Sequence, residues 1–141
     1  MPLPLCVVDA FTREAFRGNP AAVCLPGPEA TSSWMQSVAA ELNLSETAFA
    51  IPLEPGRWRL RWFTPTREVP LCGHATLASA HVLYETGRAR AGRIEFATLS
   101  GALRATRLPA GAIELDFPAY ASEPALLPVA VAAALGATPV A

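Results

Sequence analysis

A carboxylate and an imidazole, in two short polar segments, are the residues of this chain best placed for proton chemistry. Glu46 stands between two hydroxyl residues in NLSETAFAI, at the entrance to an apolar run. A carboxylate buried there without a partner costs free energy, and burial favours its neutral form, so Glu46 is either on a solvated strand edge or a working acid. His74, in CGHATLASAHVL, could donate a hydrogen bond or carry a proton.

The CGH segment also has the features of an anion site. Gly73 opens a predicted helix that runs from His74 to Glu85 and that Gly87 closes. Free backbone N–H groups at such a helix start, together with the positive end of the helix dipole, bind a carboxylate or a phosphate. A glycine lets a ligand approach the backbone closely, although an ordinary turn glycine explains the same residue.

The cysteines and the second histidine admit further interpretations. Cys72 could be a nucleophile activated by the helix start and by His74, but a cysteine in an apolar setting is more often a small buried hydrophobe. His81 lies two helical turns from His74, and Cys72 with His74 supplies only two ligands, so we predict no metal site. Cys6, Cys24 and Cys72 are odd in number and far apart, which favours reduced thiols.

The elements that position these residues are predicted to be two helices among mostly antiparallel strands. TSSWMQSVAAELNL is helical, with a capping box formed by Ser33 and Gln36, so Glu46 stands at a helix-to-strand junction. A short helix followed by the start of a strand is expected after Pro124. The strands are expected over 3–9, 21–25, 46–51, 57–63, 93–99, 102–108 and 112–117.

Residue spacing predicts which of these elements are buried. RWRLRWF alternates Trp58, Leu60 and Trp62 with three arginines, which is typical of a half-buried strand with a solvated arginine face. Small residues along GHATLASAH indicate that this helix is closely enclosed by strands. The aliphatic segment 3–9 is expected to be a buried first strand.

Composition limits the function. The 141 residues are 52% hydrophobic, enough for one modest core. The net charge is -1, and the 11 basic residues are all arginines without a dense cluster, so we expect no nucleic-acid partner. The absence of lysine excludes a Schiff-base lysine and a phosphate-binding Walker lysine. We read no secretory signal and no membrane partner in the sequence, and expect a cytoplasmic location.

Four blocks of the sequence strongly resemble the PhzF-like family of isomerases: DAFTREAFRGNPAAV, ELNLSETAF, LRWFTPTREVPLCGHATLASAHVL and TLSGAL. The resemblance runs from about Leu3 to near Tyr120. It implies an α+β fold of the diaminopimelate-epimerase-like type, in which two similar domains each wrap a mostly antiparallel, barrel-like sheet around a central helix. Residues 1–119 would be the N-terminal domain, and residues 120–141 a linker and the truncated start of the second.

The resemblance also implies an activity and a set of site residues. In the phenazine enzyme a glutamate moves a proton between ring carbons of a dihydro-hydroxyanthranilate, and that glutamate corresponds to Glu46. Ser45 and Asn19 fall in the motifs that line the substrate pocket, while Gly73 and His74 match the loop that would hold the substrate carboxylate. We therefore expect catalytic roles for Glu46 and His74, substrate binding by Asn19, Ser45 and Gly73, and no cofactor.

The expected partners are a small carboxylate-bearing substrate and a second copy of the chain, since homodimers are common in the family. Family members are about twice as long as this chain, which suggests a fragment, a short isoform or a truncated gene model. Whether this chain alone is an enzyme is therefore left open, the alternative being a non-catalytic binding or regulatory module. A cysteine-dependent epimerase would need a thiol facing Cys72, which Cys6 and Cys24, in predicted core strands, do not supply.

Overall fold

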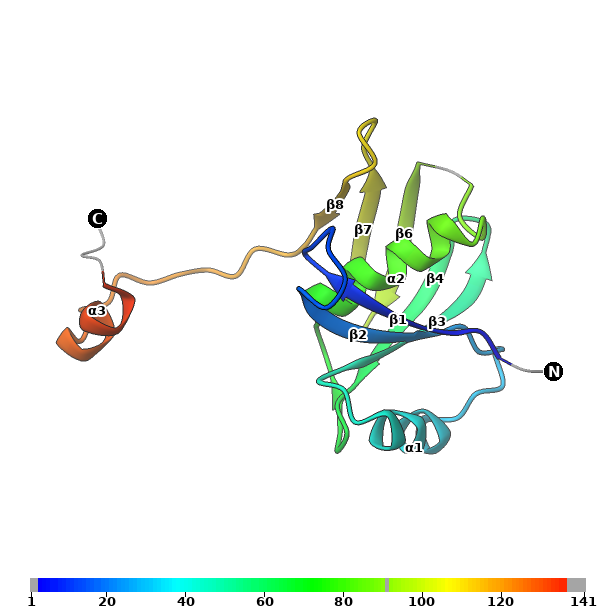
Figure 1. Ribbon diagram of the computed structural model, residues 1–141, viewed down its shortest axis with the longest axis horizontal. Helices are drawn as coiled ribbons and strands as arrows, with labels where there is room; N and C mark the ends of the chain where they lie inside the picture. Colours follow the sequence, from blue (N-terminus) through cyan, green and yellow to red (C-terminus); the bar gives the residue numbers. More distant parts are fainter. Residues whose placement is uncertain (1–2, 91, 137–141) are drawn as a thin grey trace.

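An eight-stranded mixed sheet curls around a helix in the computed structural model, which describes residues 3–90 and 92–136 (Figure 1). The strand order is β1-β2-β3-β4-β6-β7-β8, with β5 paired to β4. Five strand pairs are antiparallel and two are parallel, which confirms the predicted mostly antiparallel sheet. The elements are β1 (Leu5–Ala10), β2 (Asn19–Cys24), α1 (Ser32–Leu42), β3 (Thr47–Glu54), β4 (Arg57–Phe63), β5 (Glu68–Val69), α2 (Gly73–Glu85), β6 (Arg93–Thr98), β7 (Gly101–Arg107), β8 (Ile113–Asp116) and α3 (Val129–Leu135).

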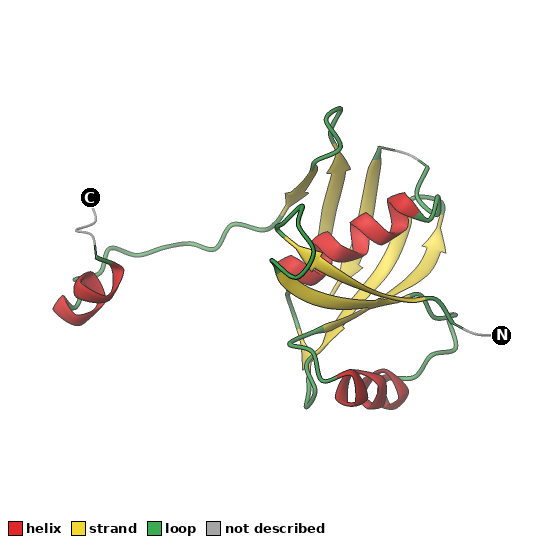
Figure 2. Cartoon of the chain, viewed as in Figure 1, coloured by secondary structure: helices red, strands yellow, loops and turns green. Residues whose placement is uncertain are grey.

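Helix α2 lies inside the curl of the sheet, as Figure 2 shows. Nine of its 13 residues are buried, and they lie on all sides of the helix. A helix that is apolar all round belongs in a core rather than at a surface. Ala75, Ala78 and Ser79 are fully buried, and their small side chains let the strands approach the helix closely. The predicted enclosure of this helix is confirmed.

Strand β4 supplies the large side chains that fill the space between the sheet and α2. Trp58, Leu60 and Trp62 are all at most 5% exposed and belong to the same core cluster as α2. The alternating arginines lie on the other face, where Arg61 pairs with Glu68 of β5. The alternation in RWRLRWF therefore predicted the inner and outer faces of this strand correctly.

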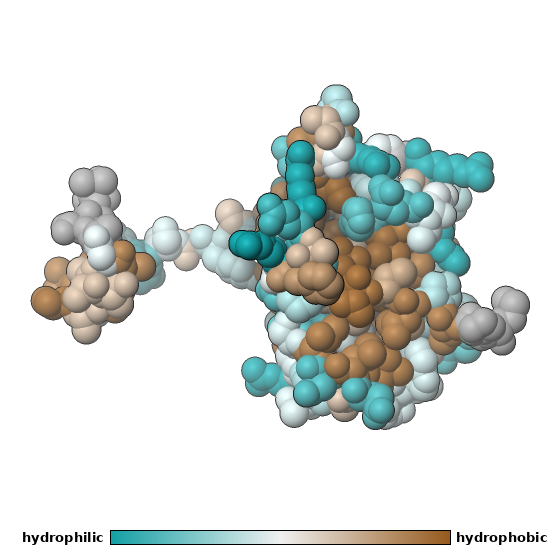
Figure 3. Space-filling view, viewed as in Figure 1, coloured by the Kyte–Doolittle hydropathy of each residue, from teal (hydrophilic) through white to brown (hydrophobic). Residues whose placement is uncertain are grey.

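Strand β1 is an edge strand, and the prediction that it is buried is wrong. Within the described residues β1 pairs with β2 alone and stands at one end of the sheet, while β8 stands at the other end. Leu5 is 46% exposed and Val7 is 60% exposed. Figure 3 shows apolar side chains gathered on the face over β1. An aliphatic run alone does not reveal how many neighbours a strand has.

Helix α1 packs on the outside of the curled sheet, and its N-terminus differs from the predicted capping box. Thr31 is the N-cap, and its Oγ1 accepts a hydrogen bond from the backbone N–H of Trp34 at 3.2 Å. The expected partners, Ser33 and Gln36, do not cap each other. The amide of Gln36 instead donates to the carbonyl of Thr64 at 2.9 Å, which ties α1 to the end of β4.

The chain leaves the sheet after β8. Residues 117–128 contain no helix or strand, and α3 follows with no buried residue. Figure 1 shows this segment extending away from the sheet. The short helix predicted in the tail is confirmed, whereas the strand expected after it falls on 137–141, outside the described residues. The boundary near Tyr120 stays a prediction.

Candidate active site

Glu46 is held at the junction of α1 and β3. Helix α1 ends at Leu42, and its C-cap residue Asn43 adopts the left-handed conformation with φ 51°. Asparagine tolerates this conformation better than most residues, so the chain can turn sharply there and enter β3 four residues later, at Thr47. The Glu46 side chain immediately precedes β3 and is 23% exposed. It is therefore fixed by two rigid elements and is still open to solvent on one side.

His74 is held by the first turn of the buried helix α2. The N-cap residue Cys72 makes no side-chain capping bond, so α2 begins with backbone N–H groups that its own cap does not satisfy. A Cβ added at Gly73 would meet only the Phe117 ring, at 3.6 Å, which leaves the backbone there approachable. This start of α2 has the partial positive charge and the free donors of an anion site.

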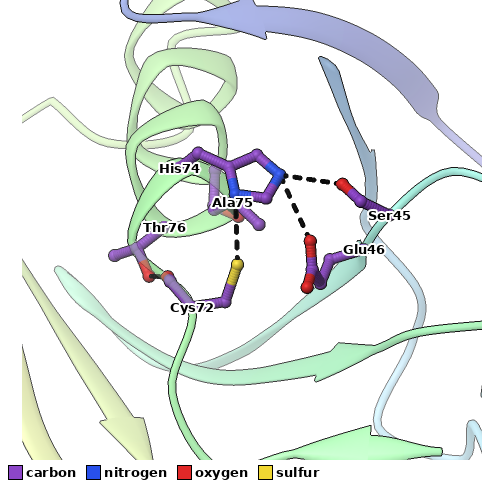
Figure 4. Close-up of polar contacts among 7 residues, drawn as sticks. Ser45, Glu46, Cys72, His74, Ala75 and Thr76 are labelled. Carbon is purple, nitrogen blue, oxygen red and sulfur yellow. Dashed lines mark hydrogen bonds and ion pairs between the residues drawn. The ribbon is translucent and has the colours of Figure 1, made fainter. Parts of the chain in front are cut away.

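Figure 4 shows the imidazole of His74 with a thiol on one side and a carboxylate and a hydroxyl on the other. Its Nε2 lies 3.5 Å from Oε2 of Glu46 and 3.4 Å from Oγ of Ser45. Its Nδ1 lies 3.4 Å from Sγ of Cys72. The His74 side chain is only 9% exposed, so its ring orientation is fixed by these neighbours. A carboxylate and an imidazole in contact beside a helix start can move a proton to or from a bound carboxylate-bearing molecule.

Cys72 lies in this cluster but lacks the character of a nucleophile. Burial raises the pKa of the Cys72 thiol from 9.0 to about 11, and the negative charge of Glu46 adds to this rise against backbone hydrogen bonds that oppose it. The thiol is therefore protonated near neutral pH, whereas reactive cysteines have a lowered pKa. Cys24 is also buried and Cys6 partly buried, and all three thiols are free.

Glu46 adds a third ligand-type group to Cys72 and His74, which the spacing along the chain had not revealed. Ligand atoms of the three lie within 4.8 Å of one another. The two nitrogens of the ring, however, face different partners, Nδ1 the thiol and Nε2 the carboxylate. One nitrogen cannot bind an ion together with both groups in this arrangement, and the positive end of α2 opposes a cation. The cluster fits proton chemistry better than a metal.

Four of the five residues predicted for the site lie together, whereas Asn19 stands apart from them. Ser45, Glu46, Gly73 and His74 meet at the start of α2. Asn19 is the exposed first residue of β2, where it pairs with Ala10 of β1. In the part of the chain that the structure describes, no hydrogen bond links Asn19 to the cluster. Its role in substrate binding stays a prediction.

A groove of about 530 Å³ lies elsewhere on the domain, and neither Glu46 nor His74 lines it. It lies against the middle of α2 and is bordered by β1 and β8, the two ends of the sheet. Its polar side chains include Asp9, Arg13 and His81. The groove lies where β1 and β8 do not pair, and it is separate from the contact between Glu46 and His74.

A mostly antiparallel sheet curled around a helix is a fold that occurs in the epimerase and racemase class. The fold recurs in a hydroxyproline epimerase from Agrobacterium vitis, with a TM-score of 0.57 over 80% of this chain and 40% of that one. Because the two are only 12% identical, this likeness shows the fold alone. The predicted diaminopimelate-epimerase-like α+β class is confirmed.

Sequence comparison defines the family within this class. Residues 8–133 match the family described as phenazine biosynthesis-like protein, and the chain belongs to that family. It is 56% identical to an uncharacterized isomerase of Halalkalibacterium halodurans, over 84% of this chain and 44% of that protein. It is 52% identical to the mouse phenazine biosynthesis-like domain-containing protein 1, over 88% of this chain and 45% of the relative.

A solved structure of the family agrees with the fold described above. The phenazine biosynthesis protein of the PhzF family from Enterococcus faecalis is 46% identical and has a TM-score of 0.73, covering 77% of this chain and 42% of that one. The chain thus spans less than half the length of the relatives that it matches. In its described residues, no helix is both long and apolar enough to cross a membrane.

Proposed function

We propose that this chain carries the acid/base half of an isomerase site that moves a proton on a small carboxylate-bearing substrate. The observation that carries the proposal is the contact between Glu46 and His74 at the open start of α2, at 3.5 Å. Membership of a family with relatives named isomerases supports the same reaction type. We further propose a cytoplasmic, homodimeric protein that needs no cofactor.

Glu46 is the general acid/base in this proposal. Its carboxylate takes a proton from a substrate carbon, and the electron pair of the broken C–H bond moves into the π system next to the substrate carboxylate. The protonated Glu46 then returns the proton to a second carbon, so that atoms and charge balance. A positioned acid/base group of this kind contributes typically about 10²- to 10⁴-fold to the rate.

The start of α2 binds the substrate carboxylate. Its unsatisfied backbone N–H groups and the helix dipole stabilise the negative charge that grows as the C–H bond breaks. Gly73 allows that approach, because no side chain covers the backbone there. Ser45 and Asn19 complete the contacts to the substrate, and His74 orients the Glu46 carboxylate.

Deuterium exchange tests the proposal. The chain is incubated in deuterium oxide with a dihydro-hydroxyanthranilate, and deuterium at the substrate carbons is followed by NMR. We expect exchange with the wild type and a loss of at least about 100-fold with Glu46→Gln. Glu41→Gln, an exposed residue of α1, is the matched control. Retention of exchange by Glu46→Gln would overturn the assignment of the acid/base group.

One observation favours a second candidate, a carboxylate-binding module without turnover. Glu46 is 23% exposed and does not line the groove beside the middle of α2 or either of two smaller grooves in the described part of the chain. Proton abstraction from carbon is favoured by a site that excludes water. Saturable amide NMR shifts at Gly73 and His74 on titration with hydroxyanthranilate, without deuterium exchange, would support the module over the isomerase.

A further inference from the structure

Cys72 contacts the nitrogen of His74 that faces away from Glu46. The Sγ of Cys72 lies 3.4 Å from Nδ1, within hydrogen-bond range for sulfur, and the cysteine is 8% exposed. On the opposite side of the ring, Nε2 faces Oε2 of Glu46 and Oγ of Ser45. Figure 4 shows the ring bridging the thiol and the carboxylate. The imidazole therefore links the thiol to the Glu46 carboxylate.

The sulfur and the ring can share a hydrogen in two ways, and the surroundings favour one. On the other side of the ring, Nε2 faces the Glu46 carboxylate and the Ser45 hydroxyl, and a carboxylate accepts hydrogen bonds but cannot donate them. Nε2 is therefore the nitrogen that donates, which leaves Nδ1 as an acceptor for the hydrogen of the Cys72 thiol. Burial raises the pKa of Cys72 to about 11, so this hydrogen is present near neutral pH.

A neutral imidazole carries a hydrogen on only one of its two nitrogens. If Nδ1 accepts from the thiol, the hydrogen must be on Nε2, where the neighbours are a carboxylate and a hydroxyl. Both of these can accept it. The opposite tautomer would direct Nδ1–H at the sulfur, which is only a weak acceptor, and would leave the Glu46 carboxylate without a donor from His74.

We propose that Cys72 is a positioning residue: its S–H donates to Nδ1 of His74 and holds the imidazole in the tautomer whose Nε2–H is directed at Glu46. The catalytic meaning of this contact rests on the proposed function, whereas the tautomer itself does not. His74 then acts as a hydrogen-bond donor to the Glu46 carboxylate and not as a second base. When Glu46 gains a proton, Oγ of Ser45, 3.4 Å from the same nitrogen, can accept the Nε2–H instead.

The tautomer can be measured directly by long-range ¹H–¹⁵N NMR of the histidine rings in the 141-residue chain. The spectra are recorded at about pH 8, above the usual titration range of histidine. His81→Gln identifies the His74 signals, because the chain has only two histidines. We expect the wild-type ring to be protonated at Nε2, with a single set of nitrogen shifts. Protonation at Nδ1 in the wild type would overturn the proposal.

Two variants at Cys72 separate the donor from simple packing. Cys72→Ser keeps a donor at this position and is expected to keep the Nε2–H tautomer. Cys72→Ala removes the donor, and its His74 ring is expected to show averaged shifts from both tautomers, while its backbone amide spectrum stays folded. Unchanged His74 nitrogen shifts in a folded Cys72→Ala variant would overturn the proposal, and so would loss of the tautomer in a folded Cys72→Ser variant.

Turnover gives a second readout that a structural role would not reproduce. In the exchange assay we expect Cys72→Ala to lower kcat about tenfold with little change in KM, and Cys72→Ser to restore most of the loss. Equal loss in both variants would contradict the positioning role. If the wild type shows no exchange but its His74 carries the hydrogen on Nε2, the proposed function fails and the tautomer assignment stands.

Discussion

Oε2 of Glu46 lies 3.5 Å from Nε2 of His74, although the two residues come from different elements of the fold. Their exposures differ: the His74 side chain is 9% exposed, and that of Glu46 is 23% exposed. The imidazole is thus largely buried, whereas the carboxylate lies on the solvent side of the imidazole ring. This asymmetry suits a division of roles in which Glu46 meets the substrate and His74 holds Glu46 in place.

The substitution Gly73→Ala is expected to separate binding from folding. The new methyl group would contact only the Phe117 ring, at an ordinary distance of 3.6 Å, and Gly73 is not in the left-handed region. The free energy of unfolding should therefore change by less than about 1 kcal/mol, towards greater stability because alanine favours helix. Affinity for hydroxyanthranilate should fall several-fold, because the methyl group occupies the approach to the backbone.

Thermal unfolding and an amide NMR titration check these two effects of Gly73→Ala. The matched control is Gly92→Ala, whose added Cβ would meet no atom within 4 Å. We expect the control to bind hydroxyanthranilate as the wild type does. Equal affinity for the Gly73→Ala variant and the wild type would show that the start of α2 is not the carboxylate site.

Cys72 should make the protein less stable at high pH. The unfolded thiol loses its proton near pH 9.0 and the folded thiol only near pH 11. Between these values the folded state binds more protons than the unfolded state, so the free energy of unfolding falls as pH rises. The stabilisation is complete below about pH 9 and is lost by about pH 11, with a total on the order of 2 to 3 kcal/mol.

Urea denaturation of the wild type and of Cys72→Ser, repeated from pH 8 to pH 11, measures this effect. Cys24 and Tyr84 also have a raised pKa because of burial, so the difference between the two proteins is the relevant quantity. The wild type should lose stability more steeply than the variant over this range. Parallel pH profiles would mean that the thiol is already ionised, or free to ionise, in the folded state.

The core around α2 should be sensitive to the loss of volume. Leu83 is fully buried between α2 and the sheet, whereas Leu99 is 70% exposed in the turn between β6 and β7. Leu83→Ala is expected to cost about 2 to 5 kcal/mol, from lost transfer energy and the cavity that remains. Leu99→Ala should change stability by less than about 0.5 kcal/mol. Chemical denaturation of both variants tests this; similar costs would contradict the position of α2 inside the sheet.

Sequence periodicity predicted the parts of the fold that are determined locally. The alternation along β4 depends only on which face of a strand is buried, and the small residues of α2 depend only on how near its neighbours come. The edge position of β1 depends instead on which strands pair, and an aliphatic run cannot show this. The prediction of the α1 cap was wrong for a different reason. Thr31 and Ser33 are both hydroxyl residues that suit an N-cap, and the sequence does not show which of them takes that position.

The motifs predicted the residues of the candidate site better than their arrangement. Glu46 and His74 were chosen from separate segments, and the structure brings them into contact. The position of Cys72 behind the imidazole depends on the ring orientation, which no spacing along the chain determines. The contact of Phe117 with Gly73 joins residues far apart in sequence and also could not be predicted. Asn19 illustrates the converse, since its motif suggests a site that the described contacts do not include.

The ion pair between Arg61 and Glu68 should stabilise the β4–β5 hairpin more than an ordinary surface pair. Nε and Nη2 of Arg61 each donate to a different oxygen of Glu68, both at 2.7 Å, and the side chains are 21% and 25% exposed. The hydrogen bonds to Glu68 raise the pKa of Arg61, which stays charged at all accessible pH values. Bidentate pairs of this kind are stronger than single contacts.

A double-mutant cycle with Arg61→Gln and Glu68→Gln should give a coupling of about 1 to 2 kcal/mol, while the exposed pair Arg17 and Glu14 should give less than about 0.5 kcal/mol. Equal couplings for the two pairs would mean that geometry and partial burial add nothing at β5.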